Sequence, residues 1–423
     1  MDNGDAMKKI YTILFLIFCF LPLLVNATEL EIQSENMVLY NLTENKLLTS
    51  KNKDERVSIA SMTKIMTTLV AIEKIENLDE TIVLNYKVFE GLLAANASVA
   101  GFKVGQTVTY KDLLYGSLLP SGADATRALA LSLVGSEEEF VNLMNQKAQK
   151  LNLKNTHFVN TSGLDEEGHY STVDEVATML KEALKNETFK EIFESDTYTT
   201  SDEKLTMYGT LRTTLRKYGL KADYIIGAKT GYTLDAGRCL ASLAYDSDEN
   251  IYYLLVTAKA PTTKGYYHLT DAINIYHYYF TNYGYQKLLK VGDELVTLKT
   301  KSAKKDTVII HATEDVLKYL EKNYKREEVT MEYNGEEVVS AFTKVGTHLG
   351  NLTLFYHGEV LATVPIVLDA KIEFSLWVFI MENILIIITS IIVVVFTTHY
   401  IKERKKKRYK MKKLPKKRTL KRI

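Results

Sequence analysis

A serine followed three residues later by a lysine occurs four times in this 423-residue chain. Such a pair can supply the nucleophile and the base of an acyl-transfer reaction, provided that the lysine amine has a lowered pKa. The four matches are Ser50/Lys53, Ser61/Lys64, Ser201/Lys204 and Ser302/Lys305. The spacing alone identifies no site, because at least three of these matches need another explanation.

Only Ser61 begins a segment with a helical apolar pattern; Ser50 and Ser201 lie in polar, turn-like stretches, and Ser302 lies in a lysine-rich loop. The pattern predicts a helix with one buried face, made of Met62, Ile65, Met66, Leu69 and Ile72. Residues three apart on a helix have Cβ atoms about 5–6 Å apart, so the amine of Lys64 can reach the hydroxyl of Ser61. Free N–H groups at the helix start favour developing negative charge. A lysine has a pKa near about 10.4, and we expect burial and a neighbouring cation to lower it.

Two further short motifs contain residues of the right type. "GAKTGYT" places Lys229, Thr230 and Gly231 at the end of a predicted strand, where a glycine allows a ligand backbone to approach closely. "LLPSGADAT" places Ser121 in a turn between two predicted helices. Each motif also has a purely structural interpretation, as a plain strand edge and as a helix cap.

The three motifs in this order resemble those of the low-molecular-mass penicillin-binding proteins that are D-alanyl-D-alanine carboxypeptidases. The resemblance covers most of residues 29–285. It rests on "ERVSIASMTKIMTTLVA", "VGQTVTYKDLLYGSLLPSGADATRALA", "FVNLMNQKAQKLNLKNTHFVNTSGLD", "HYSTVDEVA" and "GAKTGYTLDAGRCLASLA". The β-rich segment and the apolar segment that follow also resemble that family's layout.

The resemblance implies a role for each matching residue. Ser61 would be the acylated nucleophile, Lys64 its general base, and Ser121 the relay of a proton to the leaving group. Lys229 and Thr230 would hold the terminal carboxylate of the substrate and raise the local positive potential. These are the parts that acyl transfer requires, together with hydrogen-bond donors for the oxyanion.

The family resemblance assigns the oxyanion donors to the backbone N–H groups of Ser61 and Tyr232. Gly231, the last residue of the strand motif, and Tyr232 would also contact the substrate. One position departs from the pattern. The second motif usually reads S-x-N, whereas here its third residue is Ala123, followed by Asp124. A methyl group cannot donate a hydrogen bond to a substrate carbonyl or hold Lys64. The departure therefore affects substrate positioning and the orientation of Lys64, and leaves the covalent step intact.

The implied function is a penicillin-sensitive, serine-type D-Ala-D-Ala carboxypeptidase. It would remove the terminal D-alanine of peptidoglycan stem pentapeptides and so act in peptidoglycan biosynthesis, cell-wall biogenesis and cell shape. β-Lactam antibiotics would acylate it. A β-lactamase would need a deacylating water, usually placed by a glutamate, and no convincing E-x-x-L-N segment is present. A catalytically impaired penicillin-binding protein is the other alternative, because of Ala123. The eight histidines show no zinc-hydrolase spacing, so we expect no metal and no other cofactor.

Both ends of the chain carry apolar segments. Lys8 and Lys9 precede an apolar run that ends at "VNATE", which predicts a signal peptide over residues 1–27; an uncleaved anchor is the alternative. Residues 376–401 contain an apolar run nearly as long as the about 20 residues that a membrane-spanning helix needs, so we predict a transmembrane helix there. From Lys402 onward, fourteen Lys or Arg stand against one Glu, which marks the cytoplasmic side. The rest of the chain is acidic and therefore unlike a nucleic-acid-binding protein.

The remaining patterns predict the architecture. The run "NMVLYNLTENKLLTS" predicts an N-terminal β-hairpin, and "YIIGAKTGY", "RCLASLAY" and "IYYLLVTAK" predict three successive antiparallel strands. These strand-like runs at both ends of residues 28–285, with helices between them, predict an α/β (α+β) catalytic domain in which helices flank an antiparallel sheet. Short alternating runs over residues 286–370 predict a small β-rich domain. We thus expect a membrane-anchored protein, with the catalytic domain outside the cell and the tail over residues 402–423 in the cytoplasm.

Overall fold

The computed structural model describes residues 30–263 and 265–412. The predicted signal peptide over residues 1–27 and the end of the basic tail lie outside the described residues. The chain divides into two compact units between Thr281 and Asn282. Gln286, where we expected the second domain to begin, lies within the strand β10 (Tyr283–Leu289).

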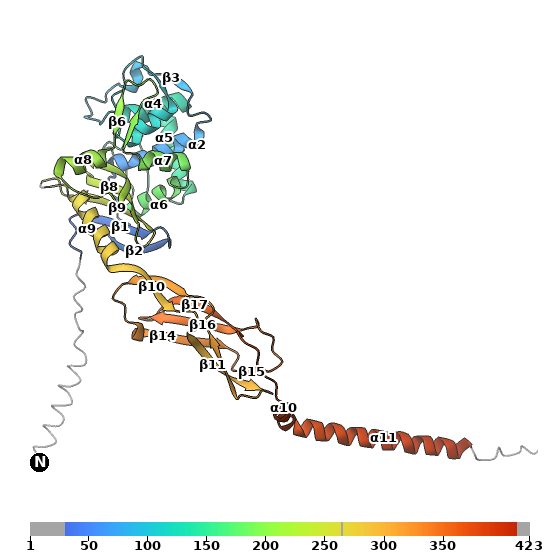
Figure 1. Ribbon diagram of the computed structural model, residues 1–423. Coiled ribbons are helices and arrows are strands. Elements are labelled where there is room, and N and C mark those ends of the chain that lie inside the picture. The colour runs from blue at the N-terminus through green and yellow to red at the C-terminus, as the bar shows by residue number, and fades with distance from the viewer. Residues whose placement is uncertain (1–29, 264, 413–423) are drawn as a thin grey trace, which may run out of the picture. The chain divides into compact units, whose positions relative to one another are not determined.

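The first unit is built on a five-stranded sheet with the order β2-β1-β9-β8-β7, in which every neighbouring pair is antiparallel (Figure 1). Its strands are β1 (Asn36–Asn41), β2 (Lys46–Lys51), β7 (Ile225–Thr233), β8 (Gly237–Asp246) and β9 (Ile251–Ala260). The N-terminal hairpin and the three later strands that the sequence predicts are therefore confirmed. The first hairpin joins the sheet beside the last strand, β9, so segments about 200 residues apart pair directly.

Helices cover both faces of this sheet. The helices of the unit are α2 (Thr63–Lys74), α3 (Tyr110–Leu118), α4 (Ala123–Val134), α5 (Glu137–Lys150), α6 (Val173–Ala183), α7 (Glu187–Glu194), α8 (Thr210–Tyr218) and α9 (Tyr267–Asn282), with the short 3-10 helices η1 (Ala60–Met62) and η2 (Tyr86–Val88). Alternate residues of β8 face opposite ways. Ala241 and Leu243 pack in the core that contains α2, whereas the hydroxyl of Ser242 lies 2.9 Å from that of Tyr276 on α9.

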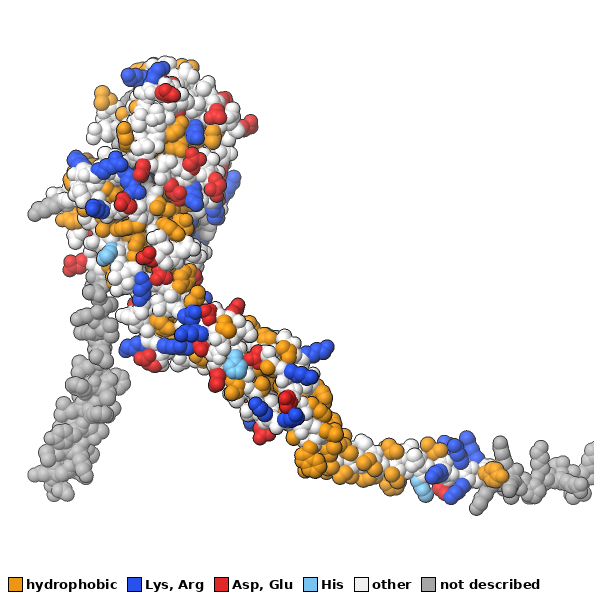
Figure 2. Space-filling view, viewed as in Figure 1, with side chains coloured by type: hydrophobic (Ala, Val, Ile, Leu, Met, Phe, Trp, Pro, Cys, Tyr) orange, Lys and Arg blue, Asp and Glu red, His pale blue; other side chains and the backbone are white. Residues whose placement is uncertain are grey.

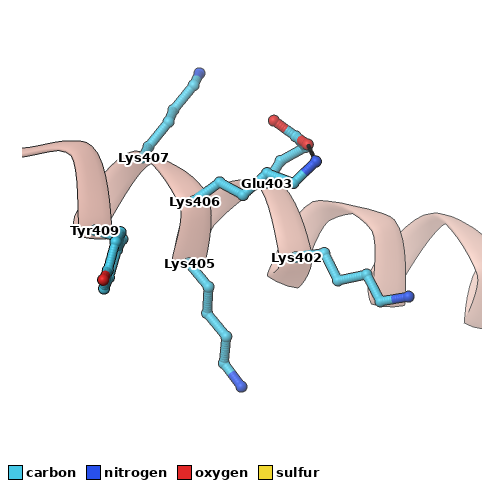
Figure 3. Close-up of a pocket in the computed structure, with 6 residues that line it drawn as sticks. All are labelled: Lys402, Glu403, Lys405, Lys406, Lys407 and Tyr409. Atoms are coloured by element: carbon cyan, nitrogen blue, oxygen red, sulfur yellow. Dashed lines mark hydrogen bonds and ion pairs between the residues drawn. The ribbon is translucent and has the colours of Figure 1, made fainter.

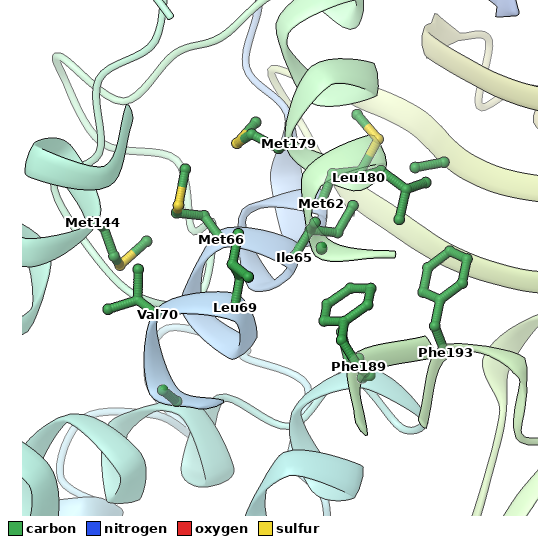
Figure 4. Packing of buried hydrophobic residues seen from close by; sticks show 14 of the residues in the cluster. Met62, Ile65, Met66, Leu69, Val70, Met144, Met179, Leu180, Phe189 and Phe193 are labelled. Carbon is green, nitrogen blue, oxygen red and sulfur yellow. The ribbon is translucent and has the colours of Figure 1, made fainter. Parts of the chain in front are cut away.

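Helix α2 is the centre of the first unit, and it differs from the prediction. Every residue from Thr63 to Ala71 is buried, so the helix has no solvent face along that length. Helices α3 to α7 surround it, and Figure 4 shows Ile65, Met66 and Leu69 packed among side chains of α5, α6 and α7. The polar side chains that we expected to face water are instead hydrogen-bonded inside the protein. Thr67 Oγ1, for example, donates to Thr161 O over 2.7 Å. The prediction of a single buried face was wrong.

Two small hairpins complete the unit: β3 (Thr81–Val83) with β4 (Thr107–Thr109), and β5 (Thr197–Thr199) with β6 (Thr206–Tyr208). Helix α3 begins with a capping box, in which Thr109 Oγ1 accepts from Asp112 N and Asp112 accepts from Thr109 N. Tight capping here fixes the start of the helix that leads into the Ser121 turn.

The second unit is β-rich, as predicted. It contains β10, β11 (Glu294–Lys301), β12 (Thr307–His311), β13 (Val316–Glu321), η3 (Arg326–Glu328), β14 (Val329–Gly335), β15 (Val338–Ser340), β16 (His348–Tyr356) and β17 (Glu359–Val367). The strands form three small sheets with the orders β10-β13, β12-β11-β15 and β14-β16-β17 around a separate apolar core. Two helices follow, α10 (Leu376–Glu382) and α11 (Ile384–Lys412). Asn383 separates them, so the single helix predicted over residues 376–401 is interrupted.

Candidate active site

The catalytic unit presents Ser61 on η1, directly before the first turn of α2. The preceding residue, Ala60, has a left-handed backbone with φ of 45°. Gly163 packs against this turn so closely that a Cβ there would lie 1.9 Å from Ala60 O, and its own φ is 80°. A strained turn held by a close backbone contact keeps the position of Ser61 fixed.

Lys64 lies next to Ser61 as the spacing predicts. Its Nζ atom is 2.9 Å from Ser61 Oγ and 2.6 Å from Ser162 O. The side chain is almost completely buried, and this burial lowers the pKa of Lys64 from 10.5 to about 7, against a smaller raising effect from Asp124. Half of the amines are then neutral near pH 7, as a general base requires. The pKa shift comes from burial and not from a neighbouring cation.

Ser121 sits in the turn between α3 and α4, with φ of 64°. Its Oγ accepts a hydrogen bond of 2.8 Å from Lys229 Nζ, and the same amine donates to Thr230 O over 2.7 Å. Lys229 is completely buried, and burial together with the charge of Lys64 holds the pKa of Lys229 well below its ordinary value. The structure thus joins the second and third motifs through one short hydrogen bond.

Gly231 also meets a steric requirement within the fold. A Cβ at this position would lie 3.0 Å from Ala60 Cβ and 3.1 Å from Ser61 N. The close neighbour is therefore the turn that carries the nucleophile, and the glycine lets β7 lie against η1. Tyr232 follows near the C-terminal end of β7, with 52% of its surface exposed.

An open groove of about 1040 Å³ runs past these residues. Ser61, Ser121, Thr230, Gly231 and Tyr232 line it, whereas neither Lys64 nor Lys229 is among its lining residues. The volume lies just above the range of about 300–1,000 Å³ that is usual for sites of drug-sized molecules. Both lysines thus lie behind the groove wall, in contact with the hydroxyl groups of Ser61 and Ser121 that line it.

The groove also contains a cation that the sequence analysis missed. The guanidinium of Arg238 lies 5.5 Å from the ring centroid of Tyr232 and 4.4 Å from that of Tyr266, and all three side chains line the groove. Among the described residues, Arg238 has no carboxylate partner, and its Nε is buried without a hydrogen bond. Arg238 pairs with Tyr232 in the β7–β8 hairpin. The place of Arg238 in the groove follows from this register, and no motif indicates it.

His268 lines the same part of the groove. Its Nδ1 atom is also buried without a hydrogen-bond partner among the described residues. Burial and the charge of Arg238 lower the pKa of His268 to about 4, so the imidazole is neutral at physiological pH. Arg238 and His268 thus each have one buried polar atom without a hydrogen-bond partner among the described residues, directly beside the groove.

Ala123 is buried at the first position of α4, and its amide N donates to Ser98 O over 2.7 Å. The adjacent Asp124 carboxylate accepts from Ala100 N and Gly101 N, at 2.7 Å and 3.2 Å. These bonds fasten the segment before α3 to the start of α4. Lys64 is oriented by the Ser162 carbonyl, so no side-chain amide at position 123 is needed for that purpose.

The other three serine–lysine matches form no catalytic pair among the described residues. Ser50 lies on strand β2 and not in a turn. Ser201 Oγ donates to Asp112 over 2.7 Å, and Ser302 Oγ donates to Glu382 over 2.8 Å. In none of the three does a hydrogen bond join the serine to its lysine.

Comparison with known proteins defines the class. The sequence matches the family described as D-alanyl-D-alanine carboxypeptidase over residues 24–261, and the C-terminal domain of penicillin-binding protein 5 over residues 283–373. The D-alanyl-D-alanine carboxypeptidase DacF of Bacillus subtilis is 32% identical over 80% of this chain and 86% of its own length. DacA of Haemophilus influenzae is 29% identical over 68% of this chain and 72% of its own length.

Solved structures agree with these matches. Penicillin-binding protein 5 from Haemophilus influenzae superimposes with a TM-score of 0.58 at 26% identity, over 81% of this chain and 98% of that one. The Streptomyces K15 DD-transpeptidase gives 0.53 at 29% identity, over 59% and 98%. This chain belongs to the D-alanyl-D-alanine carboxypeptidase family of penicillin-binding proteins, and it is a serine-type D-Ala-D-Ala carboxypeptidase. The predicted family, fold and enzyme class are confirmed, and no comparison favours a β-lactamase or an inactive relative.

Proposed function

We propose that the enzyme cleaves the bond between the two terminal D-alanines of peptidoglycan stem pentapeptides through an acyl-enzyme on Ser61. Ser61 Oγ attacks the carbonyl carbon of the penultimate D-alanine as its proton passes to neutral Lys64. The C–N bond then breaks, and the departing amine of D-alanine takes a proton through the Ser121 hydroxyl. Water hydrolyses the ester and regenerates Ser61. One observation carries this assignment: a buried amine with a pKa of about 7 lies 2.9 Å from the hydroxyl.

The developing oxyanion needs two hydrogen-bond donors. The backbone N–H groups of Ser61 and Tyr232 are the candidates, because η1 and β7 lie side by side and Gly231 brings them close. β-Lactams would acylate Ser61 by the same attack. Asparagine is absent at position 123, so the substrate amide would be held mainly along β7.

The terminal carboxylate of the substrate needs a cation in the groove. Lys229 is buried and already donates to Ser121 and Thr230, so it acts on the substrate indirectly by orienting the Ser121 hydroxyl. Thr230 faces the groove, and its Oγ1 is 2.7 Å from that of Thr210. We assign the direct contacts with the carboxylate to the hydroxyl of Thr230 and the unpaired guanidinium of Arg238.

Release of D-alanine from a synthetic D-Ala-D-Ala peptide tests the activity, and covalent labelling by fluorescent penicillin tests the nucleophile. Ser61→Ala should abolish both signals. Ser50→Ala is the matched control, because Ser50 also precedes a lysine by three residues but lies exposed on β2. Ser201 is less suitable, since its hydroxyl binds buried Asp112.

The same measurements separate the alternatives. Rapid loss of the penicillin label without release of D-alanine would favour a β-lactamase. Stable labelling without release of D-alanine would favour an impaired penicillin-binding protein. Labelling of the Ser61→Ala protein would refute the assignment of Ser61.

We further propose that α11 anchors the enzyme in the membrane with its catalytic unit outside the cell. The stretch Ile384–Tyr409 is long and apolar enough to span a bilayer, and no residue of its apolar part is buried. Its part up to Ile401 rises about 27 Å, close to the thickness of about 30 Å of a hydrocarbon core. Beyond it, Lys402, Lys405 and Lys407 point to different sides of the helix (Figure 3). Such a distribution fits the charged end of a span better than a one-sided binding surface.

In the proposed topology, a signal peptide over residues 1–27 directs export. The catalytic domain over 28–285 and the β-rich domain over 286–370 lie outside the cell, and the tail over 402–423 lies in the cytoplasm. Protease treatment of intact cells is the test. Cleavage of the two extracellular units, with a tag behind Ile423 protected until the membrane is permeabilised, is the expected result. A tag that is digested in intact cells would contradict the orientation.

A further inference from the structure

Helix α10 is fastened to the second unit through Ser302, the serine of the fourth serine–lysine match. The Glu382 carboxylate at the end of α10 accepts from Ser302 N, at 3.1 Å and 3.0 Å, and from Ser302 Oγ at 2.8 Å. Ser302 O in turn accepts from Ser375 N, which precedes α10, over 3.0 Å. All polar groups of this buried serine are therefore used to hold one short helix.

Aromatic side chains make a second attachment. Phe342 from the loop after β15, Phe374 from the segment before α10 and Phe379 from α10 form a three-ring cluster. The ring centroids lie 5.1 Å, 5.9 Å and 6.1 Å apart, in the range of favourable aromatic pairs. The hydrogen bonds of Glu382 and the ring contacts of Phe379 therefore fix the orientation of α10 relative to the β-rich unit.

The same region exposes a group of apolar side chains, which we call the basal patch: Phe342, Val345, Phe374, Leu376, Trp377 and Met381. Between 40% and 71% of each of these residues is exposed. Figure 2 shows hydrophobic side chains gathered where the β-rich unit meets the C-terminal helix. Contiguous exposed apolar surface of this kind marks an interaction site.

The position of the patch in the chain indicates what covers it. Only Asn383 separates α10 from the apolar helix α11, so the patch adjoins the proposed span directly. Aromatic residues such as Trp377 are enriched at the boundary between lipid and water. Exposed Lys344 precedes Val345, and exposed Lys304 and Lys305 follow Ala303, which pairs with Phe374 of the patch. Lysines next to a membrane surface favour anionic lipid.

We infer that the basal patch and α10 lie in the headgroup region of the outer leaflet, and that the Glu382–Ser302 contacts hold the β-rich unit in a fixed orientation on that surface. This inference rests on the proposed anchor. The membrane then contacts the loops after β11 and β15 as well as the spanning helix. Ser302 thus has a mechanical role in place of a catalytic one.

Tryptophan fluorescence tests the inference, because Trp377 is the only tryptophan of the chain. The full-length protein is reconstituted in vesicles of phosphatidylcholine and phosphatidylglycerol with lipids brominated at shallow or deep acyl positions. Trp377 should be quenched by the shallow label. In the Trp377→Phe background, indoles introduced by Phe342→Trp or, separately, by Val345→Trp should be quenched as well. Val345 provides a second probe in case the change at Phe342 disturbs the ring cluster.

Val291→Trp in the same background is the matched control. Val291 is 64% exposed. It precedes β11, whereas Ser302 follows β11, so Val291 and Ser302 lie about 25 Å apart along the strand. Its indole should keep its fluorescence. Quenching of Trp377 without quenching at positions 342 and 345 would overturn the inference and leave the anchor in place. If Trp377 is also unquenched, the anchor itself fails.

The fastening is tested by Glu382→Ala, with Glu373→Ala as control, since the only ion pair described for Glu373 is the exposed one with Lys304. Glu382→Ala should reduce quenching at position 342 and leave quenching at Trp377 unchanged. Removing the negative charge of Glu382 should by itself strengthen binding to anionic lipid and so increase quenching. A loss of quenching therefore cannot come from the change of charge alone. Unchanged quenching at position 342 would show that the Glu382–Ser302 contacts do not set the orientation.

Discussion

Replacing Lys64 by methionine should make the enzyme inactive and more stable. The fold lowers the pKa of Lys64 from 10.5 to about 7, and a shift of that size corresponds to about 5 kcal/mol against charging the amine. Methionine fills similar space without a charge. It leaves the Ser162 carbonyl without its donor, which costs about 1–3 kcal/mol. The net gain at neutral pH is then about 2–4 kcal/mol, or about 5–10 °C in Tm for a unit of this size.

The pH dependence of stability tests separately whether Lys64→Met stabilises the protein. Between pH 7 and pH 10.5 the unfolded chain binds a proton on Lys64 that the native state does not, so wild-type stability rises with pH across that window. The advantage of Lys64→Met should therefore be largest at pH 7 and below, and it should shrink toward pH 10. The assay is thermal unfolding of the catalytic unit followed by circular dichroism, with exposed Lys74 on the same helix changed to methionine as control. A variant that is destabilised at pH 7, or a difference that does not change with pH, would refute the reasoning.

Four further outcomes follow from the site. The rate of acylation by labelled penicillin should rise about tenfold per pH unit below pH 7 and level off above it, because only the neutral amine of Lys64 accepts a proton. Ala123→Asn should change peptide turnover by less than about tenfold, since one neutral hydrogen bond contributes about 0.5–1.5 kcal/mol. Arg238→Leu should raise KM by about tenfold or more for peptides with a free terminal carboxylate, and not for their C-terminal amides. Gly163→Ala should lower both Tm and the acylation rate, because its Cβ would meet a carbonyl oxygen at 1.9 Å.

Each of these outcomes has a result that contradicts it. An acylation rate that is flat from about pH 5 to pH 8 would remove Lys64 as the base. A gain on the order of a thousandfold on Ala123→Asn would show that the natural protein is an impaired relative. An equal loss on acid and amide substrates would remove Arg238 from carboxylate binding. Gly168→Ala is the control for Gly163→Ala, because its φ is also positive, at 87°, but its nearest neighbour would be 3.6 Å away.

Local patterns were sufficient to predict most of the sheet. The N-terminal hairpin and the strands β7 to β9 alternate or run apolar between turn residues, so their existence follows from residues that are neighbours in sequence. The environment of α2 does not follow in this way. Thr67 and Thr68 look like solvent-facing residues until Thr161 O and the Ser117 hydroxyl, from distant segments, provide their hydrogen-bond partners.

The site divides along the same line. The serine–lysine spacing together with the helical apolar pattern indicated Ser61 and Lys64, and the family resemblance added Ser121 and Lys229. The Ser162 carbonyl escaped prediction because a backbone oxygen has no sequence signature, and it lies 98 residues away from the amine that it holds. Arg238 lacks a motif as well, and its place in the groove depends on the register of the β7–β8 hairpin.

The two buried lysines explain why the environment of α2 matters for catalysis. Neither Lys64 nor Lys229 forms an ion pair among the described residues, so burial disfavours the charge on both, and only the smaller effect of Asp124 on Lys64 opposes it. A site that held both charges would destabilise the fold, and a site that exposed the amines to water would return their pKa values to the ordinary range. A completely buried helix α2 meets both conditions, because its apolar contacts with α3 to α7 stabilise the unit while they keep water from Lys64. The same packing that stabilises the catalytic unit therefore keeps the Lys64 amine neutral enough to take the proton from Ser61.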